Sequence, residues 1–162
     1  MIRIRPLIID DAKSSFHWRN DKEVFKFTGN TYSNYISYET ELEWIKRVIE
    51  TPNEYRCAIE VDNVYVGNIY LTDITEESAK YHIFIGEKKY WGKGVAKEAS
   101  KLILEYAFKT IKLKNVYLKV RYDNTRAIIL YKKIGFKKIS HCDEWINMVI
   151  SATNFEIIPK PV

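Results

Sequence analysis

Residues 80–109 read KYHIFIGEKKYWGKGVAKEASKLILEYAFK, and this stretch decides the fold. The β-branched and aromatic residues of 80–85 favour a strand, and apolar side chains at helical spacing predict a helix from Val95 to about Lys109. Gly92 and Gly94 lie between the two elements. Because glycine allows close backbone approach, and because the N–H groups that begin a helix favour anions, this turn is predicted to bind a pyrophosphate.

Two familiar phosphate loops fit this turn poorly. A Walker loop needs Ser or Thr after Gly-Lys, whereas Gly94 follows Lys93 here. A dinucleotide-binding loop needs a small residue where Lys97 stands, and an acidic residue about twenty positions further on. A glycine-lined turn that binds no ligand therefore stays open as an alternative.

Outward from this stretch, the chain predicts an α/β (α+β) fold with a mixed sheet of about seven strands and about four helices. Asp10-Asp11 are expected to cap a helix that ends near Asn20, and Asp62-Asn63 suit a tight hairpin turn. The unit from Lys80 to Val120 predicts parallel strands. The strands are expected at 2–7, 56–61, 64–72, 80–85, 115–120, 136–140 and 145–150, and the remaining helices at 37–50, 95–109 and 124–135.

The net charge of the 162-residue chain is +5, but its distribution is uneven. Residues 86–140 hold 15 Lys and Arg against 4 Asp and Glu, a net +11, and the rest of the chain carries a net −6. This basic third predicts an anionic partner, either nucleic acid or a small polyphosphate ligand. The length and the lack of a linker predict one domain over 1–162.

The two cysteines, Cys57 and Cys142, do not form a disulfide scaffold and are expected to be structural. They favour a reducing compartment, and no signal peptide or membrane span is apparent, so a soluble cytoplasmic protein without membrane contact is expected. No metal-ligand spacing is present, and no metal is predicted.

Residues 85–96, IGEKKYWGKGVA, resemble the acetyl-CoA pyrophosphate loop of the GNAT N-acetyltransferase superfamily. The family pattern is Arg/Gln-x-x-Gly-x-Gly/Ala. Gly94 and Ala96 match it, whereas Trp91 stands where Arg or Gln is usual. Tyr-Trp-Gly-Lys-Gly is similar to the variant of the RimJ/RimL-like branch.

A second stretch, NTRAIILYKKIGF at residues 124–136, resembles the GNAT segment that follows the next strand. The start of the chain, with Ile4-Arg5-Pro6-Leu7, also looks RimJ/RimL-like, so the resemblance covers nearly the whole chain. It implies the GNAT fold, acetyl-CoA as co-substrate, and transfer of acetyl to a primary amine by direct attack in a ternary complex.

The resemblance also assigns the cofactor contacts. The backbone N–H groups of the glycine loop bind the pyrophosphate, and a freed N–H on the preceding strand holds the thioester carbonyl. Asn124 contacts the pantetheine arm and also caps a helix. The cofactor-binding residues predicted in this way are Ile83, Phe84, Ile85, Trp91, Gly92, Lys93, Gly94, Val95, Ala96, Asn124 and Tyr131.

Tyr131 is the candidate proton donor, because a phenol can protonate the thiolate that leaves when an amine attacks a thioester. The alternative is a core tyrosine. His82, just before the loop, is the candidate base, and a hydrogen-bonded strand histidine is the more ordinary interpretation. Glu23 and Glu87 are weaker candidates, and water chains can replace a single base.

The acceptor wall is predicted at Trp18-Arg19-Asn20 and the aromatic residues that follow, which include Phe25, Phe27, Tyr32 and Tyr35. Trp18-Arg19-Asn20, followed by a helical Glu-x-x-Trp44 that begins at Glu41, is similar to N-acetyltransferases that act on nucleotide-linked amino sugars, and such a sugar is the favoured acceptor. The acidic balance favours instead a polyamine or a ribosomal-protein N-terminus. A nucleic-acid-binding module, a GNAT protein without catalysis and a homodimer also stay open.

Overall fold

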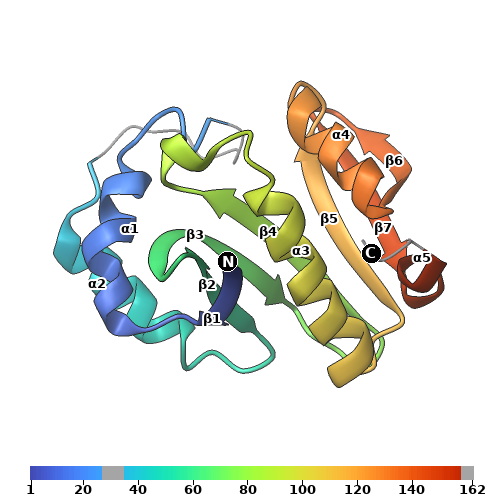
Figure 1. The fold of residues 1–162 in the computed structure, drawn as a ribbon, viewed down its shortest axis with the longest axis horizontal. Coiled ribbons are helices and arrows are strands. Elements are labelled where there is room, and N and C mark those ends of the chain that lie inside the picture. The colour runs from blue at the N-terminus through green and yellow to red at the C-terminus, as the bar shows by residue number, and fades with distance from the viewer. Residues whose placement is uncertain (27–34, 158–162) are drawn as a thin grey trace.

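Seven strands form one mixed sheet in the order β1-β2-β3-β4-β5-β7-β6, which confirms the predicted architecture (Figure 1). The computed structural model describes residues 1–26 and 35–157, with side chains to Phe155. The strands are β1 (Ile2–Pro6), β2 (Tyr55–Val61), β3 (Val64–Thr72), β4 (Ser78–Ile85), β5 (Asn115–Arg121), β6 (Lys137–Cys142) and β7 (Trp145–Ser151).

Five α-helices accompany the sheet within the described residues, where about four were expected. They are α1 (Ala12–Arg19), α2 (Tyr38–Val48), α3 (Val95–Glu105), α4 (Thr125–Ile134) and α5 (Ala152–Ile157). Two 3-10 turns, η1 (Ile9–Asp11) and η2 (Lys88–Tyr90), and a π-helical turn η3 (Tyr106–Thr110) complete the set. The sequence prediction missed α5, which is only six residues long.

The sheet is antiparallel except where β4 meets β5. These two strands pair in parallel only from Ser78 opposite Asn115 to Lys80 opposite Tyr117. After that point their described residues are not paired, whereas β4 stays paired with β3 as far as Ile85. The predicted parallel unit is confirmed, and the two strands separate toward their carboxyl ends.

Each face of the sheet has its own apolar core. On one face α3 covers alternate residues of the central strands, such as Ile69, Leu71 and Val116, each 0% exposed. On the other face α1 and α2 bury Ile45 and Ala58. Figure 1 shows α1 and α2 beside β1–β3, with α4, β6 and β7 on the far side of β5. Since burying one large apolar side chain contributes about 1.5–3 kcal/mol, these two cores hold the gap between β4 and β5 in a rigid frame.

Short-range signals set several boundaries as predicted. Asp62 and Asn63 both have positive φ, 48° and 68°, as a type I′ hairpin turn requires. Asn124 begins α4 by accepting a hydrogen bond from the Ala127 N–H at 3.3 Å. Gly135 ends the same helix with φ 120°.

The predicted cap at Asp10-Asp11 is wrong. Neither side chain caps α1, and residues 9–11 form a 3-10 turn instead. The Asp11 carboxylate, 5% exposed, accepts two hydrogen bonds from Arg5 at 2.8 and 2.9 Å and one from the Ile8 N–H at 2.9 Å. A partner on the preceding strand, six residues earlier in the chain, therefore satisfies the carboxylate that local spacing had assigned to the helix.

Candidate functional site

The gap between β4 and β5 leaves backbone groups of β4 without a strand partner on one side. The Gly86 N–H donates to the Val66 carbonyl at 2.8 Å, which fixes the alternation of hydrogen bonds between β3 and β4. Because antiparallel pairs alternate, Phe84 opposite Asn68 directs its N–H to β3, and Ile83 directs its N–H toward the gap. Of the two predicted thioester contacts, the geometry therefore favours Ile83.

The glycine loop at the start of α3 has the shape of an anion cradle. Gly92 and Gly94 have φ of 72° and 79°, in the left-handed region. A Cβ on Gly94 would meet no protein atom within 4 Å apart from its chain neighbours, so the space beside its Cα is open. Val95 is 3% exposed and anchors the helix in the core. The loop therefore presents backbone donors at a helix N-terminus, and these residues fit the pyrophosphate of CoA.

A hydrogen bond from Trp91 connects this loop to the sheet. Its indole Nε1–H donates to the Ile85 carbonyl at 2.8 Å. Trp91 replaces the Arg or Gln that is usual in the family, and the structure gives its ring a positioning contact at the end of β4. Lys93 is exposed beside it, with its Nζ 5.9 Å from the centre of the Tyr90 ring.

Tyr131 lies on α4 against the α3 side of the sheet. Its ring packs edge-on against Tyr81 at 5.8 Å and Phe136 at 5.9 Å. Burial raises the pKa of the Tyr131 phenol to about 12, so it holds its proton at neutral pH. The core role and the proton-donor role are therefore compatible at this one position.

His82 lies on the opposite face of β4 from Tyr81, because successive strand residues alternate. Its Nε2 is 2.9 Å from the Thr72 hydroxyl. Loss of solvation, together with the charges of Arg56 and Lys80, lowers the pKa of His82 below 6.5. The imidazole is thus neutral near pH 7 and can accept a proton, but the structure does not place it on the same face as Tyr131.

The predicted acceptor residues Trp18 and Asn20 are occupied by packing and hydrogen bonds. Trp18 is 4% exposed and donates to Glu87 at 3.0 Å, and a Cβ on Gly86 would lie 2.0 Å from its ring. The Asn20 amide donates to the carbonyls of Phe16 and Ile36 at 2.8 and 2.7 Å, and its oxygen accepts from the Ile36 N–H at 2.8 Å. Both side chains position α1 against neighbouring segments.

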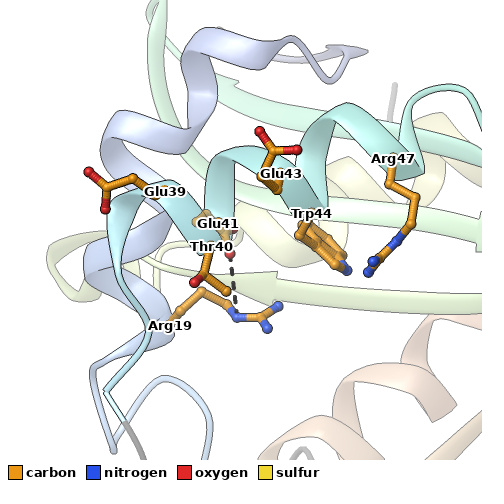
Figure 2. A pocket seen from close by; sticks show the side chains of 7 residues that line it. All are labelled: Arg19, Glu39, Thr40, Glu41, Glu43, Trp44 and Arg47. Atoms are coloured by element: carbon orange, nitrogen blue, oxygen red, sulfur yellow. Dashed lines mark ion pairs between the residues drawn. The ribbon is translucent and has the colours of Figure 1, made fainter.

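Arg19, the remaining member of that triplet, faces a hollow of about 390 Å³ beside α2 (Figure 2). Its Nε lies 3.7 Å from Oε2 of Glu41, whose other oxygen accepts from the Ser15 hydroxyl at 2.8 Å. Glu41 is 1% exposed, and burial raises its carboxyl pKa above 4.5. The residues that line the hollow are Arg19, Glu39, Thr40, Glu41, Glu43, Trp44 and Arg47.

Arginines and aromatic rings form a cluster next to this hollow. The Arg19 and Arg56 guanidinium carbons each lie 5.2 Å from the centre of the Trp44 ring, and that of Arg56 lies 4.5 Å from the Tyr70 ring. The Tyr70 hydroxyl and Glu41 Oε2 are buried without a hydrogen-bond partner among the described residues. Glu41 belongs to the Glu-x-x-Trp44 pattern that the sequence analysis singled out, whereas Arg56 and Tyr70 were missed, since only long-range packing shows that these residues meet.

Other predicted candidates are engaged elsewhere or lie outside the described residues. Glu87 accepts from Trp18, and Glu23 lies 3.6 Å from Lys88. The aromatic residues Phe27 and Tyr32 of the predicted acceptor wall fall within 27–34, outside the described part.

Within the described ranges 1–26 and 35–157, no group of three His, Cys, Asp or Glu side chains could hold a metal ion. No helix in those ranges is long and apolar enough to cross a membrane.

Comparison with known protein families shows to which family the chain belongs. Residues 2–137 match the model of the GNAT acetyltransferase domain. The chain therefore belongs to the GNAT acetyltransferase family, and it is an N-acetyltransferase with acetyl-CoA as co-substrate, as the loop resemblance predicted.

Individual relatives add detail. The chain is 28% identical over 137 residues to the spermidine N(1)-acetyltransferase of Escherichia coli K12, covering 83% of this chain and 72% of that protein. Its fold matches a Vibrio cholerae spermidine N-acetyltransferase solved with CoA and spermine, with TM-score 0.87, 23% identity, and coverage of 96% and 98%. It also matches the Campylobacter jejuni N-acetyltransferase PseH, with TM-score 0.72, 19% identity, and coverage of 93% and 97%. These findings support the superfamily, and not the RimJ/RimL-like or amino-sugar branch specifically.

Proposed function

We propose that this protein transfers the acetyl group of acetyl-CoA directly to a primary amine of a polyamine in a ternary complex. The observation that carries the proposal is the separation of β4 from β5 after Lys80 and Tyr117, with the glycine cradle next to it. The backbone N–H groups of β4 and of the loop that begins α3 then face the gap in which acetyl-CoA would bind. The hollow beside α2, where the acceptor would bind, lies on the other face of the sheet.

The described residues divide the chemistry between them. Acetyl-CoA supplies the thioester, and the N–H groups of Gly92–Ala96 hold its pyrophosphate. The Ile83 N–H binds the carbonyl oxygen as it gains charge. Tyr131 donates its phenolic proton to the departing thiolate, and neutral His82 accepts the amine proton through water.

The polyamine acceptor rests on two observations. The Escherichia coli relative and the Vibrio cholerae structure reported above are both spermidine acetyltransferases. Glu39 and Glu43 place two exposed carboxyl groups at the rim of the hollow, whereas Glu41 is buried beside Arg19 and Arg47 adds a second cation to the lining. The two exposed carboxyl groups are the ones that would attract a polycation. These findings support the polyamine better than the nucleotide-linked amino sugar that the sequence favoured.

One feature keeps the amino sugar as a second candidate. Arg19 and Arg56 flank the Trp44 ring, and an arginine beside an aromatic ring can bind a phosphate while the ring stacks on a base or sugar. The basic third contains the cradle and α4, so under either acceptor its charge serves the CoA phosphates rather than a nucleic acid.

An acceptor screen tests the proposal by CoA release with polyamines, nucleotide amino sugars and N-terminal peptides. We expect turnover with spermidine or spermine, and a KM for that amine that rises with salt, because salt screens exposed charges. Turnover with amino sugars or peptides alone would refute the polyamine assignment.

A pair of charge variants sharpens this test. Glu39→Gln is expected to raise the polyamine KM by about threefold to tenfold with kcat nearly unchanged, since a rim charge contributes mainly to binding. Glu50→Gln, an exposed site that does not line the hollow, serves as the matched control. Equal effects of the two variants would contradict the location of the acceptor site.

A further inference from the structure

Thr72 and His82 meet across the β3–β4 ladder. The register places Tyr70 opposite His82 and Thr72 opposite Lys80, so these four side chains share the face of the sheet away from α3. Thr72 is therefore a diagonal neighbour of His82, within reach of a long side chain. The Thr72 Oγ1 lies 2.9 Å from the His82 Nε2. Because the ladder holds both residues, their contact belongs to the sheet and not to a loop.

The two ring nitrogens of His82 have different surroundings. Nε2 contacts the Thr72 hydroxyl, whereas Nδ1 forms no hydrogen bond with any residue that the structure describes. The ring keeps part of its surface exposed to solvent. A neutral imidazole has one N–H donor and one acceptor nitrogen, and the hydrogen bond at one nitrogen sets which of the two carries the proton. The Thr72 contact thus decides which nitrogen can accept a proton.

Four charged groups face the imidazole. They are Glu54 and Arg56 at the start of β2, Asp73 after β3, and Lys80 on β4. They form two ion pairs, Glu54 with Arg56 at 2.6 Å and Asp73 with Lys80 at 2.9 Å. These pairs act on the ring through their charge. The Thr72 hydroxyl is the described group that hydrogen-bonds to the ring, and it can therefore fix the position of the ring proton.

His82 lies on the side of the sheet that carries the hollow. The pairing of β4 with β5 ends at Lys80, so His82 stands beside the gap in which acetyl-CoA is proposed to bind. It shares its face with Tyr70, whose ring packs 6.5 Å from that of Trp44 in the hollow, whereas Tyr131 lies in the core on the α3 side. A base and a proton donor on opposite faces suit direct attack, because the amine enters from one side and the thiolate leaves on the other.

We propose that Thr72 is a positioning residue for the base: its hydroxyl oxygen accepts a hydrogen bond from the Nε2–H of His82, so that Nδ1 takes the proton of the acceptor amine. This inference rests on the proposed role of His82. Nδ1 receives one proton from the ammonium group of the acceptor, directly or through water, and the imidazolium then releases it to solvent. Nε2 keeps its own proton throughout, and its hydrogen bond strengthens while the ring is charged. The hydroxyl thereby stabilises the imidazolium.

Nuclear magnetic resonance of the ligand-free protein tests the tautomer without any acceptor. Two-bond ¹H–¹⁵N spectra show which ring nitrogen carries the proton, and His82→Asn identifies the His82 signals among the three histidines. We expect the Nε2–H form in the wild type. Thr72→Val should lower the pKa of His82 further, because the imidazolium loses an acceptor, and Thr72→Ser should restore it. An Nδ1–H form, or a pKa that rises in Thr72→Val, would overturn the inference, since the hydroxyl would then donate to Nε2.

Steady-state acetylation of spermidine tests the consequence for catalysis. Thr72→Val is expected to lower kcat by about tenfold, a part of the roughly 100-fold or more that a general base contributes. It should also move the acidic limb of the pH profile of kcat to lower pH and leave the KM for acetyl-CoA unchanged, and Thr72→Ser should restore both kcat and the profile. Thr51→Val is the matched control, because the Thr51 hydroxyl donates to the Arg47 carbonyl at 3.0 Å at the end of α2. Its loss should leave kcat and the pH profile as in the wild type.

A double variant separates positioning from a structural role. In a His82→Asn background, Thr72→Val should have no further effect on kcat. An equal loss in that background, or unaltered turnover in His82→Asn itself, would contradict the inference. If the wild type does not acetylate spermidine, the polyamine proposal fails, and the tautomer and pKa measurements still decide the role of Thr72.

Discussion

Replacement of Gly94 by alanine separates the strain of the loop from its ligand contacts. Gly94 has φ 79°, and an alanine in the left-handed region costs about 1–2 kcal/mol. The new Cβ meets no protein atom within 4 Å, so no steric cost is added. For a chain of this length each 1 kcal/mol lowers Tm by about 2–4 °C, which predicts a fall of about 2–8 °C for the ligand-free variant.

The same Cβ would stand in the open space beside the Gly94 Cα, at the loop where we propose that the anion binds. We expect it to weaken CoA binding by at least about tenfold, through loss of one charge-assisted hydrogen bond. At a CoA concentration of about 100 Kd the wild type gains about 2.7 kcal/mol, or about 5–11 °C in Tm. A tenfold weaker variant gains about 1.4 kcal/mol at the same concentration, so the ligand-induced rise is roughly halved.

Thermal unfolding with and without CoA measures both effects at once. Asn63→Ala is the matched control, because Asn63 has φ 68° in the hairpin turn between β2 and β3, away from the cradle. It should lower Tm by a similar amount and keep the full rise with CoA. A full rise in Gly94→Ala, or a reduced rise in Asn63→Ala, would refute the reasoning.

Three further predictions concern the proton donor, the hollow and the α1 contact. Tyr131→Phe should lower turnover by about 100-fold with the Kd of CoA nearly unchanged, measured by thiol release; unaltered turnover would remove the phenol from the mechanism. Burial raises the pKa of the Glu41 carboxyl, so this carboxyl binds a proton more tightly in the folded protein than in the unfolded chain. The free energy of unfolding of the wild type should therefore fall, relative to that of Glu41→Gln, as the pH rises from about 4.5. Urea unfolding at several pH values checks this, and a constant difference would contradict it. Gly86→Ala should cost about 1–3 kcal/mol or more, since its Cβ would lie 2.0 Å from the Trp18 ring; an unchanged urea midpoint would show that the ring moves freely.

Local signals allowed much of this fold to be predicted. Glycines at 92 and 94, the Asn124 cap and the Asp62-Asn63 turn each need a backbone conformation that few residues adopt, so sequence and structure agree there. The periodic apolar residues predicted the helix α3 correctly. The α-helix ends at Glu105 and not near Lys109 as predicted, because a π-helical turn follows it.

Contacts between separate elements explain what local spacing could not predict. Asp11 was expected to cap a helix, yet Arg5 on β1 takes its carboxylate. Glu41 has the spacing of an ordinary polar helix residue, and only the packing of α1 on α2 buries it beside Ser15 and Arg19. Such contacts join residues that no spacing rule relates.

Neighbouring residues were enough to predict the proposed cofactor half, because a glycine loop and a capped helix are local structures. The packing of distant segments was needed to show which members of Trp18-Arg19-Asn20 face the hollow and that Arg126 borders the loop at Gly92. The physical reason is that a side chain's partners depend on how helices pack across the sheet, and that packing brings together residues distant in the chain. The acceptor side is therefore specified by tertiary contacts, and the pyrophosphate side by local backbone conformation.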